Sequence, residues 1–164
     1  MKEGLIGVNR MVFPQEEILD CQKLYEEDFY LWIQTTAKLL QEKRFNEVDL
    51  DNLIDEVEAL GRSERKAIRS NLKVLLMHLL KYQYQSQKRS NSWLSTIKEH
   101  RQRLRDDLKD SPSLKPYLRD IFAAIYVDAR LEAAAETGLS LETFPLECPF
   151  SPEQTLNPEF LPDL

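Results

Sequence analysis

The chain has 164 residues, of which 42% are hydrophobic and 30% charged, values that are ordinary for a folded protein and too apolar for a disordered one. No apolar run approaches the roughly 18 residues that a membrane span requires, and two cysteines, Cys21 and Cys148, are too few for a disulfide framework. Charge interrupts the first ten residues too early for a secretion signal, so we expect a cytoplasmic protein without a membrane partner.

Glycine and proline, which punctuate secondary structure, are concentrated at the ends of the chain. No proline lies between Gln15 and Ser111, and Gly61 is the only glycine between Val8 and Thr137. The middle of the chain therefore has almost nothing to stop a helix. Because the two-residue alternation typical of strands is also absent, the sequence predicts an all-α fold.

Apolar residues recur at intervals of three and four, as on one face of a helix, in four segments. We expect helices over residues 22–44, 50–85, 92–109 and 114–137. The apolar phase passes through Gly61 without a jump, and one interior glycine costs only about 1 kcal/mol. The second segment is therefore predicted to form one long helix, and whether it bends at Gly61 is left open.

The tail after Gly138, the expected C′ glycine of the fourth helix, holds five prolines among its last 20 residues. It is predicted to be extended, with one helical turn at 152–155 capped by Ser151. Its large apolar side chains are expected to pack on the bundle: Phe144, Leu146, Phe150, Leu156, Phe160 and Leu161.

We therefore predict a single-domain helical bundle of four main helices over residues 24–164, with the tail 139–164 packed on it. A partly helical lead over residues 1–23 precedes this domain. The prediction rests on the four periodic segments and on the apolar character of the tail.

Several short motifs at characteristic spacing carry a family resemblance over nearly all of the chain after residue 23. They include Leu24-Tyr25-Glu26-Glu27-Asp28-Phe29 with Trp32, Asp49-Leu50-Asp51-Asn52-Leu53, Leu60-Gly61-Arg62-Ser63, Met77-His78-Leu79-Leu80-Lys81-Tyr82-Gln83, Ser92-Trp93, and Phe144-Pro145 with Cys148-Pro149. On these motifs the chain resembles the bacterial family called domain of unknown function 29. The resemblance implies an all-helical domain and implies no activity.

The net charge of −6 is unevenly distributed. Residues 1–61 hold 6 Lys and Arg against 14 Asp and Glu, residues 62–110 hold 13 against 5, and residues 111–164 hold 3 against 9. The basic segment 62–110 either binds a polyanion or packs between acidic helices so that opposite charges meet within the fold. We favour the second interpretation, because the net charge repels nucleic acid at long range.

The most distinctive stretch, residues 81–93, combines cations, aromatic rings and amides and leads into the third helix, which we expect Ser92 to cap. Its backbone N–H groups and cations suit an anion such as phosphate or a carboxylate. The alternative, which we favour, is that its aromatic rings join the core and that Arg89 pairs with a carboxylate of the first or second helix. The candidate residues for anion binding or structural pairing are Lys81, Lys88, Arg89, Asn91, Ser92 and Trp93.

Metal chemistry has one candidate, formed by His78, His100 and Glu99. If the second and third helices form an antiparallel hairpin, the two histidines lie at similar heights. No third ligand has motif spacing, so we disfavour a metal site and expect no cofactor. GxGxxG, P-loop, HExxH and CxxC motifs are absent from the sequence.

The acidic run at the start of the second helix, and one cysteine, complete the candidates. Asp51 and Asp55 are one turn apart and could share a cation, but acids are also favoured at a helix N-terminus by its dipole, and we favour this simpler role. Cys148 has no base within sequence reach, so we expect a buried anchor rather than a nucleophile. The run contains Asp49, Asp51, Asp55, Glu56 and Glu58.

These observations favour a non-catalytic helical module that acts through protein contacts, either with a second copy of itself or with another protein. The alternative is a phosphate- or nucleic-acid-binding protein that uses the basic segment 62–110. A metal-dependent enzyme built on His78, His100 and the acids is the weakest of the three hypotheses.

Overall fold

The computed structural model describes residues 21–163. Of these residues 79% are helical and none lies in a strand, which confirms the all-α prediction. The chain divides into two compact units, one ending at Glu58 and the other beginning at Ala59. A single domain over residues 24–164 stays a prediction. The expected lead over residues 1–23 lies almost wholly outside the described residues.

The first unit contains two short α-helices, a 3₁₀ turn and the beginning of a long helix. These elements are α1 (Cys21–Glu27), α2 (Phe29–Gln41), η1 (Phe45–Glu47) and α3 (Leu50–Tyr84).

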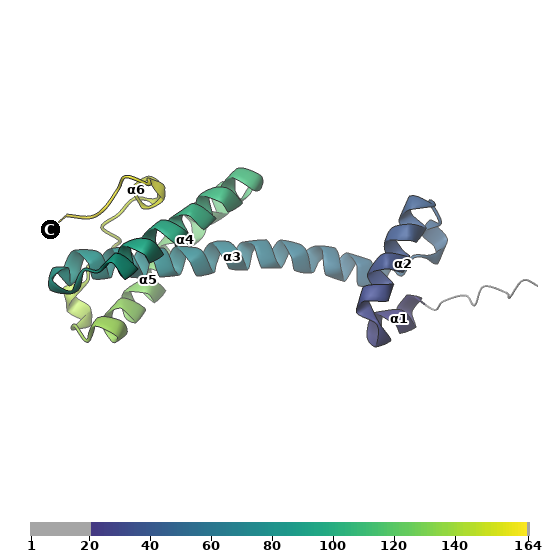
Figure 1. Ribbon diagram of the computed structural model, residues 1–164, viewed down its shortest axis with the longest axis horizontal. Helices are drawn as coiled ribbons and strands as arrows, with labels where there is room; N and C mark the ends of the chain where they lie inside the picture. The colour runs from purple at the N-terminus through teal and green to yellow at the C-terminus, as the bar shows by residue number, and fades with distance from the viewer. Residues whose placement is uncertain (1–20, 164) are drawn as a thin grey trace, which may run out of the picture. The chain divides into compact units, whose positions relative to one another are not determined.

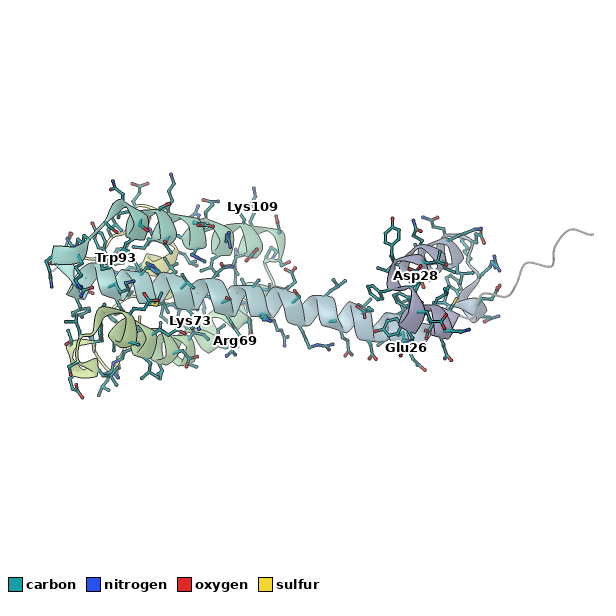
Figure 2. The ribbon with its side chains drawn as sticks, turned by 60° about the horizontal axis from the view of Figure 1, so that its bottom comes forward. Glu26, Asp28, Arg69, Lys73, Trp93 and Lys109 are labelled. Carbon is teal, nitrogen blue, oxygen red and sulfur yellow. The ribbon has the colours of Figure 1, made fainter. Side chains whose placement is uncertain are left out.

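The prediction of one helix over residues 22–44 is wrong, because two helices, α1 and α2, lie in this range. Asp28 separates them with an extended backbone (φ −149°, ψ 84°), and its carboxylate accepts a hydrogen bond of 3.0 Å from the backbone N–H of Leu31. Asp28 and Glu26 are labelled in Figure 2. An aspartate that can cap a helix competes with the helix backbone, and here the cap prevails over a continuous apolar periodicity.

The buried core of the first unit is small. Its apolar members are Leu24, Trp32, Leu39 and Val48. The ring centroid of Tyr25 lies 5.0 Å from that of Trp32, and the Tyr25 hydroxyl donates a 2.7 Å hydrogen bond to Glu56 Oε1 on α3. This contact ties α1 to the start of the long helix.

The second unit is built around the remainder of α3. Figure 1 shows α4 and α5 alongside this part of α3, with α6 beside α4. The predicted long helix over 50–85 is confirmed, because α3 is one α-helix that continues through Gly61. The further elements are η2 (Ser86–Lys88), α4 (Asn91–Asp110), α5 (Leu114–Thr137), η3 (Leu141–Thr143) and α6 (Pro152–Leu156).

The core of the second unit surrounds α3, whose buried side chains between Ile68 and Leu80 point to several sides of the helix. A helix segment that is apolar on most faces requires neighbours on most faces. The α3 members are Ile68, Leu72, Leu75, Leu76, Met77, Leu79 and Leu80, and the other elements add Ile97, Leu104, Leu108, Leu118, Phe122, Ile125, Tyr126, Ala129, Ala133, Phe144 and Phe150.

The C-terminal tail belongs to this core, but not with all of its apolar residues. Phe144 and Phe150 are buried, whereas Leu146 is 82% exposed, so its expected burial is wrong. The predicted turn capped by Ser151 is confirmed: Ser151 and Gln154 form a reciprocal capping box at the start of α6. Leu156 and Phe160 also pack against the core, so the tail is anchored while Leu146 lies in solvent.

Gly61 and Gly138 are expected to respond to alanine in opposite directions. A Cβ on Gly61 would meet no atom within 4 Å, so Gly61→Ala should stabilise the protein by about 0.5–1 kcal/mol, the usual gain inside a helix. Gly138 has φ +70°, so Gly138→Ala should destabilise it by about 1 kcal/mol. Urea unfolding followed by circular dichroism measures both changes, and a destabilised Gly61→Ala variant would contradict the helix described here.

Candidate functional site

The most unusual polar contact of the second unit is made by Arg101 of α4. Its side chain is buried, with 3% of the residue exposed. Its guanidinium donates hydrogen bonds to the backbone carbonyls of Thr155 (2.8 Å), Pro158 (3.4 Å) and Phe160 (2.9 Å). Within residues 21–163 no carboxylate forms an ion pair with it. Burial lowers the pKa of Arg101, but arginine remains protonated near neutral pH, so the fold contains a buried positive charge held by carbonyl dipoles.

A groove of about 390 Å³ lies beside Arg101, between α4 and residues 158–161, and is called the α4–tail groove below. Its charged lining consists of Lys98, Arg101 and Arg105 against Glu159. Its apolar lining comes from Leu94, Ile97, Pro158 and Leu161. The groove thus combines an excess of positive charge with an aliphatic surface.

The α4–tail groove is not apparent from the sequence. The spacing of Lys98, Arg101 and Arg105 does place them on one face of a helix, and this was the available signal. The missing information was the path of the tail, because nothing in its prolines and polar residues indicates which carbonyls meet Arg101.

Lys81, predicted as an anion ligand or a structural partner, has contacts within the second unit. It is 7% exposed, and its Nζ lies 2.6 Å from Glu136 Oε2 on α5 and 4.7 Å from the centroid of the Trp93 ring. The ammonium group is therefore neutralised and covered inside the bundle.

Arg89 also has internal partners, but not the expected carboxylate. Its Nε donates a 2.7 Å hydrogen bond to the Tyr82 carbonyl, and its guanidinium carbon lies 4.2 Å from the centroid of the Tyr82 ring. The expected carboxylate partner is wrong, because the turn carries Arg89 back to the end of α3. Carbonyls at a helix C-terminus are unpaired and carry the negative end of the dipole, so they can satisfy a cation without an acid.

The third predicted helix begins one residue earlier than expected, at Asn91. Ser90 is its N-cap and accepts a 3.3 Å hydrogen bond from the Trp93 backbone N–H, so the cap assigned to Ser92 is wrong. Lys88, Asn91 and Ser92 are exposed. The structure brings Lys81 and Trp93 together and does not gather all six candidate residues around one site.

The two histidines contact neighbouring polar groups. His78 Nδ1 lies 3.0 Å from the Val74 carbonyl, which can only accept, so Nδ1 carries the proton. His100 Nδ1 lies 2.8 Å from Asn71 Oδ1, and Glu99 pairs with Arg103. Burial lowers the pKa of both histidines. In the described part of the chain no three His, Cys, Asp or Glu side chains are grouped to hold a metal ion.

The acidic run and Cys148 also have structural partners. Asp49 is buried and accepts a 2.7 Å hydrogen bond from Asn52 Nδ2 beside the start of α3, while Glu56 accepts from Tyr25. Cys148 packs against the core, and burial raises the pKa of its thiol to about 11. A thiol that stays protonated at neutral pH is a poor nucleophile.

The charges of segment 62–110 meet acids only in part. Lys73, Lys81 and Arg103 pair with Glu132, Glu136 and Glu99. Carbonyl groups bind Arg89, Arg101 and Arg105, the last through Leu156. Other cations are exposed, among them Lys66, Arg69, Lys88, Lys98 and Lys109, and Figure 2 labels Arg69, Lys73 and Lys109.

The family model described as "Domain of unknown function DUF29" matches residues 24–161, most of the chain and both units. The chain belongs to this family. No curated protein and no solved structure matches it. None of the helices described for this DUF29 chain is long and apolar enough to cross a membrane.

Removal of the Arg89 side chain from this DUF29 protein should cost about 2 kcal/mol, the lower end of the sum of one charge-assisted hydrogen bond and one cation–π contact, because both are exposed. Lys88→Ala, at an exposed neighbour, is the matched control and should change stability by less than about 0.5 kcal/mol. The measurement is urea unfolding with and without added phosphate. Loss of a phosphate-dependent stabilisation in Arg89→Ala would contradict the structural role.

Removal of the Arg101 charge should have a larger effect, because Arg101→Gln leaves buried tail carbonyls without donors. We expect a loss of about 3 kcal/mol in the free energy of unfolding. Arg103→Gln breaks only the exposed pair with Glu99 and should cost less than about 1 kcal/mol. Equal losses in the two variants would show that the Arg101 bonds do not hold the tail.

Proposed function

We propose that this DUF29 chain is a non-catalytic interaction module whose first unit associates with the first unit of a second copy. The observation that carries this proposal is the apolar surface of the first unit. It consists of nine large side chains that are between 37% and 70% exposed: Phe29, Tyr30, Leu31, Ile33, Leu40, Phe45, Leu50, Ile54 and Val57.

Most of these side chains form stripes rather than scattered points. Phe29, Ile33 and Leu40 lie on one face of α2, because their spacings of four and seven residues are close to whole turns. Leu50 and Ile54 lie in the same way on α3. Exposed apolar stripes on two helices of one small unit are typical of an interaction surface.

The exposed area is of the order that a dimer needs. The three aromatic residues alone expose on the order of 300 Å², at roughly 150–250 Å² for a whole aromatic side chain. The six aliphatic residues add to this area, and a stable interface buries about 800 Å² on each partner. A contact between two identical surfaces closes as a twofold dimer, the commonest arrangement of identical chains.

Charge makes the proposed contact distinguishable from other contacts. Residues 21–58 hold 4 Lys and Arg against 10 Asp and Glu, so two copies of this unit repel each other electrostatically. Salt screens that repulsion and leaves apolar burial intact. Association of two first units should therefore strengthen with salt, whereas docking of the acidic unit on a basic surface should weaken.

The test measures the mass of the full chain by sedimentation equilibrium from about 1 to 100 µM, at about 50 and 500 mM NaCl. We expect a monomer–dimer equilibrium that shifts toward the dimer at the higher salt. The double variant Ile33→Gln, Ile54→Gln should raise the dissociation constant at least about tenfold, a loss of 1.4 kcal/mol. Both positions are about half exposed, so the fold should tolerate the change.

Leu146→Gln is the matched control, because Leu146 is more exposed than either isoleucine but belongs to the second unit. It should leave the dissociation constant unchanged. A monomer at every concentration would overturn the proposal. So would association that weakens with salt, since that result assigns the surface to a basic partner.

We do not propose nucleic-acid binding by segment 62–110. Lys73, Lys81 and Arg103 pair with carboxylates of the same chain and Arg101 is buried, which leaves fewer charges for a phosphate backbone.

A further inference from the structure

The α4–tail groove is a second candidate for binding, separate from the apolar surface of the first unit. It lies wholly within the second unit, between α4 and residues 158–161, and its volume of about 390 Å³ falls in the range of small-molecule sites. The inference below therefore does not rest on the proposed self-association.

The groove has an excess of positive charge. Among the residues that the structure describes, Lys98, Arg101 and Arg105 line it against Glu159 as the one acid. The hydrogen bonds of Arg101 and Arg105 go to carbonyls of the tail, which orient the guanidinium groups without cancelling their charge. Repulsion by Arg105 contributes to the lowered pKa of Arg101, as expected for two cations that share one site.

The rest of the lining is aliphatic. Leu94 contributes accessible surface from α4 and Leu161 contributes it from the tail, whereas Ile97 is only 2% exposed. A free inorganic anion would leave this surface against water, whereas an alkyl chain would cover it at a gain of about 0.8 kcal/mol for each buried CH₂ group. The apolar lining therefore selects for a ligand with both a charged head and an aliphatic body.

The single acid in the lining favours a head with one charge. Glu159 repels every anion in the groove, and its repulsion of a dianion is about twice that of a monoanion. A carboxylate also matches the paired donors of an arginine such as Arg105. From this arrangement we propose that the α4–tail groove binds a small aliphatic carboxylate, with its head at Lys98 and Arg105 and its chain on Leu94 and Leu161.

The test uses the full chain and four probes in calorimetric titrations: octanoate, octanol and octylamine, which share an eight-carbon chain, and inorganic phosphate, which has none. Octanoate should bind with one site per chain. Octanol and phosphate should bind at least about tenfold more weakly, because each lacks one half of the required chemistry. Octylamine should not bind, because its charge is repelled.

Two variants locate the site. Lys98→Gln and Arg105→Gln should each weaken octanoate binding about fivefold or more, through loss of one charged contact with the head. Lys109→Gln is the matched control, because Lys109 is an exposed cation of α4 that does not line the groove. It should leave the affinity unchanged, and circular dichroism verifies that all three variants are folded.

Glu159→Gln tests the preference for one charge and should strengthen phosphate binding more than octanoate binding. The double variant Ile33→Gln, Ile54→Gln, which alters only the first unit, should bind octanoate normally whatever its oligomeric state. Equal binding of octanoate and octylamine, or octanoate affinity that survives Lys98→Gln and Arg105→Gln, would overturn the proposal.

Discussion

The second unit depends on one constraint, the need to bury a segment of α3 that is apolar on most of its faces. Met77 and Leu79 are both buried although, two residues apart, they point to nearly opposite sides of the helix. One neighbouring helix can cover only one of those sides. For this reason α4, α5 and the tail all pack on the same part of α3, and the one lysine among the buried residues, Lys81, needs both Glu136 and the Trp93 ring.

The tail meets a different constraint, imposed by its prolines. Proline has no N–H, so a proline-rich segment cannot pair its backbone in a helix or sheet, and its carbonyls need donors from elsewhere. Side chains of α4 and α5 supply them. Arg130 donates to the carbonyls of Leu141 and Phe144, and the Tyr126 hydroxyl donates to that of Pro145 at 2.7 Å. Together with Arg101, these donors fasten an irregular segment to a helical bundle by polar bonds as much as by apolar contacts.

The sequence predicts the features of this fold that depend on neighbouring residues, and it does not predict those that depend on residues far apart in the chain. The sequence predicts the bounds of α5 and the glycine that ends it, and it places the end of α3 within one residue. These features are predictable because apolar periodicity, Gly138 and, for α3, the absence of proline act locally. The sequence does not predict the break at Asp28, because the apolar periodicity favours one continuous helix whereas a capping aspartate favours the start of a new one. Only packing decides between them. The partners of Arg89 and Arg101 cannot be predicted from nearby residues, because they are backbone carbonyls. Every residue carries a carbonyl, so no residue type identifies the one that binds.

The two units differ in how much of their apolar surface they bury, and this difference follows from their size. A unit of fewer than 60 residues buries too small a fraction of its surface to hide many large side chains. Among residues 21–58, the first unit accordingly buries only Leu24, Trp32, Leu39 and Val48 of its large apolar residues and exposes more than it buries. Its acidic excess makes two copies of the unit repel each other, and salt screens that repulsion without weakening apolar contact. If two first units associate as proposed, the strength of their contact depends on ionic strength, which is why salt dependence discriminates between a second copy and a basic partner.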